Sequence, residues 1–422
     1  MRKEVWASPS GNDRAAGSQS DPLTLSGAVK LQRTNRGDRR IVLTDGRFEI
    51  REALDPGSVE IVARNRHGAT ITRSRRSPGK KTLIYHNGSK SGTLTLSGIV
   101  LDPQYFGRAI RAKDCGRVVV SDCIIRQCDN HGIDATRAVE LRVDDSSITL
   151  CLALRKDGTR ADAHGITSAG CPSTVIRNTF VDRCSGDSYQ LERSRNAGPV
   201  TIRGCLFSNS ALPKDIVTID GRTLFYAGER VGENGVDFKQ GNDDTPPHVL
   251  IEDTVFEGWR SLRTKSPPSK PGDRPRFIFD PAALNIKGSV HVEANGVDVV
   301  DSEIAWRIRG ANHGNKLKGV SVTGGTTHQC DVMVNLEDRV GNIFSDDSDR
   351  VVFREYRFEW SANTKSWVRA WSKRPVRAEF LDCAYQGFPF APQAMLARLK
   401  PAFRYFTNGR KRQRVPHDIT IK

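Results

Sequence analysis

The sequence has no apolar run of about 18 residues, the length that a membrane-spanning helix needs, so we expect no membrane span. Its first residues, MRKEVW, contain no apolar stretch of the kind that secretory signals carry, so we expect no signal peptide in this chain. Its nine cysteines include no Cys-x-x-Cys pair, which argues against the common zinc sites, and their odd number argues against a complete set of disulfides. Zinc-finger, helix-turn-helix and RNA-binding aromatic motifs are missing too, so we expect no specific nucleic-acid partner.

Positive charge is plentiful and unevenly placed, with a formal net charge of +16. Residues 64–81 hold seven Lys or Arg and no acidic residue, and residues 391–422 hold eight against Asp418 alone. Such runs are either solvated surface or a field that attracts a polyanion, and both interpretations stay open. With 37% hydrophobic residues and 37 glycines, the composition is that of a globular protein.

The central chain consists of short β-branched runs separated by Gly, Asn and Asp, which is typical of many short strands. Five runs superpose when the chain is aligned on itself: AIRAK at 109–113, HGIDA at 131–135, HGITS at 164–168, SYQLE at 188–192 and NGVDFK at 234–239. Each is followed by a second strand, a polar turn and a third short run. A repeat this short cannot bury its own apolar face, so the sequence predicts a solenoid in which three-strand rungs stack.

The cysteines support this register independently. Cys128, Cys151 and Cys184 each lie five residues after the matching positions Cys123, Ser146 and Thr179. The spacing predicts an interior stack of small side chains at the end of the third strand.

The repeat, together with VWASPSGND at 5–13 and SDPL at 20–23, resembles pectate-lyase-like right-handed parallel β-helix proteins over roughly residues 4–345. The resemblance implies an all-β fold, a polysaccharide as substrate, and an extracellular or periplasmic location. We expect residues 1–350 to form the β-helix and residues 351–422 an aromatic, basic and partly helical cap, with a helix in 392–399. The cap aromatics Trp360, Trp367, Trp371, Tyr385, Phe388 and Phe390 are alternatively sugar-stacking platforms. The Pro-rich segment 264–277 is expected to be a loop that interrupts the coil.

Alternation along the first strands places chemistry-bearing side chains on the outer face. Two outward ladders follow, one of Arg111, Asp134, Thr167, Gln190 and Asp237, the other of Lys113, Thr136, Ala169, Glu192 and Lys239. Gln190 and Asp237 become neighbours only if the connection 193–233 adds no rung, and residues 215–219 are a competing strand candidate. In the lyases that the chain resembles, this strip is the substrate groove.

The strip suggests the chemistry of β-elimination, in which a uronate carboxylate is neutralised and a base removes the C5 proton. Lys239 is the first candidate for the base and His164 the second. Gln190, Glu192, Asp134 and Arg111 are expected to bind substrate. Asp187, Glu233 and Asp237 are expected to hold Ca²⁺, which prefers oxygen ligands. The plainer alternative is that Glu192 and Lys239 form an ordinary ion pair and that His131 and His164 bond turn backbone.

We therefore expect a carbohydrate-active enzyme that acts on an acidic polysaccharide, with a lyase first among the candidates. A uronan C5-epimerase or a glycoside hydrolase on the same fold is the nearest alternative. A non-catalytic glycan-binding or tailspike-like protein is the alternative of a different class.

Overall fold

A computed structural model describes residues 3–35, 39–74, 82–88, 91–154, 160–192, 194, 196–217, 221, 223–239, 246–260, 281–309, 317–338, 350–372, 376–397, 399, 402–405, 412–415 and 418–422. The chain divides into two compact units. The first comprises residues 1–189, 211–231 and 268–273, and the second comprises residues 190–210, 232–267 and 274–422. The Pro-rich segment 264–277 lies outside the described residues.

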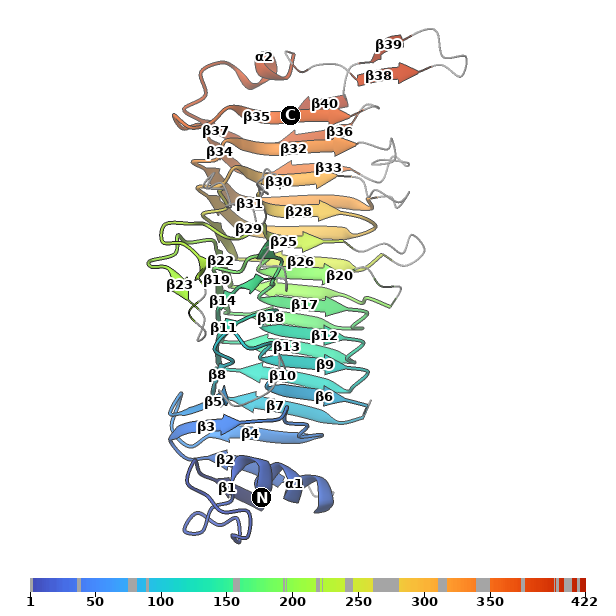
Figure 1. Cartoon of the computed structure of the whole chain (residues 1–422). Coiled ribbons are helices and arrows are strands. Elements are labelled where there is room, and N and C mark those ends of the chain that lie inside the picture. The colour runs from blue at the N-terminus through green and yellow to red at the C-terminus, as the bar shows by residue number, and fades with distance from the viewer. Residues whose placement is uncertain are drawn as a thin grey trace. The chain divides into compact units, whose positions relative to one another are not determined.

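The first unit is a coil of parallel strands that stack in three columns (Figure 1). The first column contains β6 (Ile84–Asn87), β9 (Ile110–Lys113), β12 (Ile133–Thr136) and β17 (Ile166–Ala169). The second contains β1 (Lys3–Ala7), β2 (Arg39–Leu43), β4 (Val59–Ala63), β7 (Thr93–Ser97), β10 (Arg117–Ser121), β13 (Glu140–Asp144) and β18 (Thr174–Arg177). The third contains β3 (Gly46–Ile50), β5 (Ala69–Arg73), β8 (Val100–Asp102), β11 (Ile124–Cys128), β14 (Ser147–Cys151) and β19 (Phe180–Asp182).

The second unit repeats this arrangement. Its first column contains β25 (Asn234–Phe238), β28 (Ala282–Lys287), β30 (Ile304–Arg309), β32 (Val332–Asp338) and β35 (Ser366–Ser372). The other columns contain β21 (Val200–Arg203), β22 (Leu206–Ser208), β26 (His248–Glu252), β27 (Val255–Glu257), β29 (His291–Val300), β31 (Gly319–His328), β33 (Val351–Arg354), β34 (Arg357–Glu359), β36 (Arg377–Leu381), β37 (Ala384–Gln386) and β40 (Asp418–Ile421). The strand β20 (Tyr189–Glu192) crosses the boundary between the units.

The turn between the second and third strands of a rung has one recurring conformation. Its residue has a φ between 47° and 64° in nine turns, at Asp122, Asp145, Asn178, Gly204, Asp253, Gly296, Gly324, Glu355 and Asp382. Seven of these nine are Asp or Gly and one is Asn, the residue types that tolerate a left-handed backbone best. The positive φ at this position therefore explains why Asp, Asn and Gly recur in the turns of the sequence repeat.

The predicted cysteine stack is confirmed. Cys128 and Cys151 are partners in the β11–β14 ladder, Cys151 and Cys184 share a side-chain hydrogen bond, and all three are fully buried. All nine cysteines are free thiols, and only Cys383 is partly exposed. The small sulfur-bearing side chains thus fill one corner of successive rungs, as a packing role requires.

The boundary expected at residue 350 does not mark the end of the coil. The strands β33 to β37 continue the parallel pairing in register. Trp367 is 1% exposed, and its ring lies 4.7 Å from that of the fully buried Phe380. Several aromatics assigned to a cap are therefore core residues of further rungs, because large rings take the volume that smaller side chains fill elsewhere.

Among the described residues, two helices and three antiparallel strand pairs lie outside the strand columns. The helix α1 (Leu25–Asn35), which the sequence analysis did not anticipate, buries Leu25, Ala28 and Val29. The strands β23 (Ile216–Val217) and β24 (Thr223–Phe225) form an antiparallel hairpin, and so do β38 (Ala402–Tyr405) and β39 (Arg412–Val415). The short helix α2 (Pro392–Leu396) confirms the helix expected in 392–399, so the end of the chain is partly helical. A further short antiparallel pair joins β15 (Ala153–Leu154) to β16 (Arg160–Ala161). Among the described residues, no helix is long and apolar enough to span a membrane.

The cysteine environments predict slow thiol chemistry. Burial raises the pKa of Cys123 to about 12 and that of Cys115 to about 11, so the reactive thiolate is scarce as well as shielded. In a titration of the native protein with a thiol reagent, only Cys383 should react rapidly, and Cys383→Ser should abolish that rapid phase. Rapid reaction of several thiols, or a large drop in Tm on adding a reductant, would contradict this assignment.

His86 predicts a loss of stability in acid. Its side chain is fully buried and neither ring nitrogen has a hydrogen-bond partner in the part of the chain that the structure describes. Burial lowers the pKa of His86 below 6.5, and the nearby Asp55 opposes this only in part. The unfolded chain therefore takes up the proton more readily, so stability is complete above pH 6.5 and falls as the pH drops toward the lowered value. His86→Leu should flatten the decline of Tm between neutral and mildly acidic pH, whereas His248→Leu, at an exposed position, should not.

Candidate functional site

The outward ladder of the first unit lies as the sequence predicted. Arg111, Asp134 and Thr167 are consecutive partners across β9, β12 and β17. The Asp134 carboxylate lies 3.4 Å from a guanidinium nitrogen of Arg108 and 3.8 Å from Nε of Arg111. The Arg111 guanidinium lies over the ring of Tyr85, 5.8 Å from its centroid. Two predicted binding residues, Arg111 and Asp134, are thus brought together in a charged pair that leaves Arg111 partly exposed.

His164 belongs to a stack of rings beside this ladder. The rings of His131 and His164 are stacked with centroids 5.0 Å apart. The backbone N–H of His164 donates to Nδ1 of His131 (3.1 Å), and the backbone N–H of Asp187 donates to Nδ1 of His164 (2.8 Å). The His164 side chain is only 6% exposed, with Asp187 Oδ2 3.3 Å from Nδ1. This geometry matches a histidine that satisfies turn backbone, and catalysis by His164 stays a prediction.

The glycine after each of these histidines is required by space. A Cβ at Gly165 would lie 2.4 Å from Val181 Cγ1 and 2.7 Å from the carbonyl oxygen of Ser188. The glycine of the repeated His-Gly-Ile pattern is therefore needed because neighbouring atoms lie too close to its Cα for a side chain.

The calcium prediction finds no support in the ligand geometry. Among the residues that the structure describes, no three His, Cys, Asp or Glu side chains gather closely enough to hold a metal ion. Asp187 is fully buried beside His164, Asp237 contacts two lysines, and Glu233 is half-buried. These residues do not fit an oxygen-ligand cage as they stand, so we derive no chemical step through a metal.

The second unit holds a denser cluster on the outer face of β25 and β28. Nζ of Lys287 lies 2.8 Å from Oδ2 of Asp237, and Nζ of Lys239 lies 3.5 Å from the same oxygen. Nδ2 of Asn285 donates to Oδ1 of Asp237 (3.2 Å). Asp237 is 1% exposed, whereas the side chain of Lys239 is 34% exposed and that of Lys287 19%. A buried carboxylate therefore holds two ammonium groups, and Lys239 is the more accessible of them.

The condition on the 193–233 connection is met. The strand candidate at 215–219 contributes only β23, in the separate hairpin. The backbone N–H of Lys239 donates to the carbonyl oxygen of Leu191, so Glu192 and Lys239 stand opposite each other in adjacent rungs. Gln190 is buried and donates to Oε1 of Glu192 at 2.5 Å. The predicted neighbours Gln190 and Asp237 thus share one column.

The column continues through further rungs that the sequence analysis did not place. Asp237, Asn285, Arg307, Asn335 and Arg369 are successive partners. Arg307 Nε lies 3.3 Å from Glu337 Oε1, and Arg369 Nε donates to Asn335 Oδ1 at 2.8 Å. Oδ1 of Asn285 and Oε2 of Glu337 are buried, and each lacks a hydrogen-bond partner in the described parts of the chain.

Lys287 and Asn285 are the residues that sequence reasoning missed. The rung that contains β28 was not recognised because a long segment separates it from the preceding rung. Its sequence ALNIK at 283–287 nevertheless shows the same period-2 alternation as the earlier strands. Aligning that run with GVDFK at 235–239 would have placed Lys287 beside Lys239.

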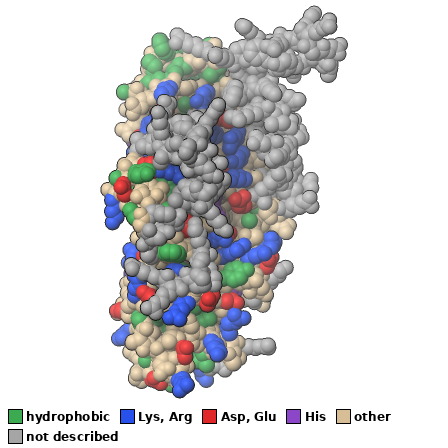
Figure 2. Space-filling model, viewed as in Figure 1, with side chains coloured by type: hydrophobic (Ala, Val, Ile, Leu, Met, Phe, Trp, Pro, Cys, Tyr) green, Lys and Arg blue, Asp and Glu red, His purple; other side chains and the backbone are tan. Residues whose placement is uncertain are grey.

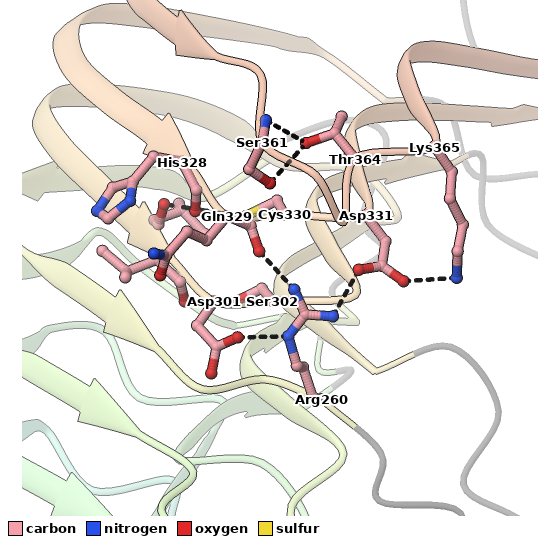
Figure 3. Close-up of polar contacts among 12 residues, drawn as sticks. Arg260, Asp301, Ser302, His328, Gln329, Cys330, Asp331, Ser361, Thr364 and Lys365 are labelled. Carbon is pink, nitrogen blue, oxygen red and sulfur yellow. Dashed lines mark hydrogen bonds and ion pairs between the residues drawn. The ribbon is translucent and has the colours of Figure 1, made fainter.

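A second polar cluster of this unit surrounds Arg260, which follows β27 (Figure 3). Its Nε lies 2.5 Å from Oδ1 of Asp301, one terminal nitrogen lies 2.5 Å from Oδ1 of Asp331, and another donates to the carbonyl oxygen of Gln329. Lys365 Nζ lies 2.7 Å from Oδ2 of Asp331. Burial alone would raise the pKa of Asp331, but hydrogen bonds from Lys365 and Arg260 outweigh it and lower the pKa. Every charged group here is paired, so we interpret the cluster as a clip between turns.

Charges of both signs lie along the visible face of the molecule, with Lys and Arg interspersed with Asp and Glu (Figure 2).

Comparison with known proteins identifies the class of fold. Residues 61–243 match the family model of the right handed beta helix region. The chain folds as a right-handed parallel β-helix. The solved structure of the pectate lyase Pel9A is similar at a TM-score of 0.51 and 13% identity, over 95% of this chain and 86% of that one.

A second solved structure is the catalytic unit of a thermostable GH87 α-1,3-glucanase from Streptomyces thermodiastaticus strain HF3-3. It is similar at a TM-score of 0.52 and 11% identity, over 98% of this chain and 67% of that one. No curated protein sequence matches the chain. At these identities the likeness establishes the fold, and the activity has to be argued from the residues.

If Arg260 holds these turns together, replacing Arg260 should destabilise the protein more than replacing Lys365, the other cation that contacts Asp331. Arg260→Met should lower the free energy of unfolding by about 3 kcal/mol, because it leaves Asp331 and Asp301 without their main partner. Lys365→Met should cost less than about 1 kcal/mol, since that lysine side chain is 73% exposed. The lowered pKa of Asp331 means that its contribution is present above pH 3.8 and is lost as the pH falls through the lowered value. Denaturant unfolding at neutral pH measures both variants, and equal costs would disprove the clip.

Proposed function

We propose that the protein is a carbohydrate-active enzyme that cleaves a uronate-containing polysaccharide by β-elimination, with Lys239 as the base. The observation that supports this most is the shared contact of Lys239 and Lys287 with the buried Asp237. Likeness in fold to a pectate lyase is consistent with the proposal and does not carry it.

The proposed reaction needs a base that is uncharged when substrate binds. The ammonium of Lys287 lies 2.8 Å from the Asp237 oxygen that Lys239 contacts at 3.5 Å, so the carboxylate facing Lys239 already has a closer cationic partner. Nζ of Lys239 then takes the proton from C5, the electron pair forms the C4–C5 double bond, and the C4–O bond breaks. Water supplies the proton that the leaving oxygen takes up.

The remaining strip residues are assigned to substrate binding. Arg307 and Arg369, two and four rungs from Asp237 in the same column, are cations suited to a polymer with regularly spaced carboxylates. Glu192 is assigned to sugar hydroxyls, as are Arg111 and Asp134 of the first unit, whereas the buried Gln190 positions Glu192 by donating to its Oε1. A polysaccharide substrate is in turn consistent with the extracellular or periplasmic location that we propose.

A hydrolase that pairs Asp237 with Glu337 is not favoured by the second unit. Asp237 and Glu337 lie three rungs apart, about 14 Å at the usual strand spacing. Paired catalytic carboxylates of glycosidases lie about 5–10 Å apart. A C5-epimerase shares the proton abstraction and differs only in the fate of the carbanion, which it reprotonates from the opposite face, so the assay has to separate the two.

The test is ultraviolet absorbance of unsaturated uronates, measured over a panel of acidic polysaccharides with and without Ca²⁺ and chelator. Lys239→Ala should reduce the rate by about 10²-fold or more, the usual size of a lost general base, while leaving the Tm almost unchanged. Lys113→Ala, on the matching ladder of the first unit, is the control and should retain activity. His164→Ala tests the second candidate in the same assay.

Loss of Lys287 should act differently. Lys287→Ala removes the closest partner of a buried carboxylate, so we expect a cost of about 3 kcal/mol in stability as well as reduced activity. Proton exchange at C5 without unsaturated product would indicate an epimerase. Binding of the polymer with neither reaction, equal in Lys239→Ala and Lys113→Ala, would favour the glycan-binding alternative.

A further inference from the structure

Arg73 is a buried charge for which the protein supplies no acceptor among the residues that the structure describes. It is the last residue of β5, where Ala69, Ile71 and Arg73 alternate onto one face and Arg73 pairs with Ile50 of β3. Its relative exposure is 1%, comparable to that of Ala69 and Ile71. Nε and both terminal nitrogens of its guanidinium lack a hydrogen-bond partner in the described ranges.

The surrounding charges do not compensate it. Burial lowers the pKa of Arg73, and the one carboxylate that opposes this, Glu52, acts through space without a hydrogen bond to the guanidinium. The sequence around it, residues 64–81, contains six further Lys or Arg and no acidic residue. The adjacent sequence therefore contains no acidic residue that could serve as a counter-charge.

An arginine in this position needs a partner on energetic grounds. A guanidinium keeps its proton at any ordinary pH, so it cannot escape the cost of burial by becoming neutral. An unpaired buried ion costs several kcal/mol, a large part of the stability of a typical domain. Buried polar groups without protein partners are commonly those that bind water or an ion.

We propose that the first unit binds a small inorganic oxoanion, sulfate or phosphate, on the guanidinium of Arg73. A polymer is excluded as the ligand because Arg73 is 1% exposed. An oxoanion suits the site better than chloride, because its several oxygens accept from the planar fork of N–H donors at once. The ligand would stabilise the early rungs, and its site is separate from the strip to which we assign the lyase activity.

The direct experiment is to denature the purified, extensively washed protein and to quantify the released anions by ion chromatography. We expect about one sulfate or phosphate per chain, and the chromatogram distinguishes the two. Arg73→Met should release none. Arg66→Met is the matched control: it removes one charge from the same basic segment, but Arg66 is 72% exposed and pairs with Asp122 at 2.7 Å, so it should retain the anion. Equal anion content in wild type and Arg73→Met, or none in the wild type, would overturn the proposal.

A second measurement, thermal unfolding with added anion, tests the proposal even if the anion is lost on purification or Arg73→Met folds poorly. Low millimolar sulfate or phosphate should raise the Tm of the wild type saturably above that in sodium chloride of equal ionic strength. Arg73→Lys, which keeps the charge and loses the fork, should need at least about tenfold more anion for the same shift. A linear response that is identical in all variants would reflect general salting-out by these ions and would refute the site.

Discussion

The structure depends on hydrogen bonding of each rung to the next in strict register. Because each strand pairs residue for residue with its neighbour, a position in one rung is committed to the column above and below it. The column of Cys128, Cys151 and Cys184 and the left-handed turns at Asp122, Asp145 and Asn178 are both consequences of this rule. A side chain that fits one rung has to be compatible with two others, which restricts interior columns to similar volumes.

The same register brings charges close together on the outer face. Adjacent rungs lie about 4.8 Å apart, within ion-pair reach for long side chains. Two like charges in one column are therefore costly unless a carboxylate lies between them. Lys239 and Lys287 meet this condition through Asp237, and Asp134 likewise lies between Arg108 and Arg111. Arg73 has no such carboxylate bonded to it among the described residues, which is why we assign it a ligand.

Sequence reasoning succeeded where the repeat was local and failed where it was interrupted. The columns of Arg111, Asp134 and Thr167 and the cysteine stack followed from period-2 alternation and matched spacing. Lys287 was missed because a long segment separates its rung from the previous one. The end of the coil was placed too early because Trp367 was assigned to a cap, whereas it is buried in a further rung. Which side of a strand becomes buried depends on packing partners that one sequence does not display.

The contacts of Asp237 suggest different roles for its two lysines, a structural one for Lys287 and a functional one for Lys239. A carboxylate buried for stability alone needs enough donors to satisfy its oxygens, and Lys287 and Asn285 already supply one to each oxygen. Lys239 adds a second positive charge at 3.5 Å, beyond a normal hydrogen bond, and keeps about a third of its side chain exposed. The two oxygens of Asp237 are therefore satisfied without Lys239, which is the more accessible lysine of the cluster for an anionic substrate.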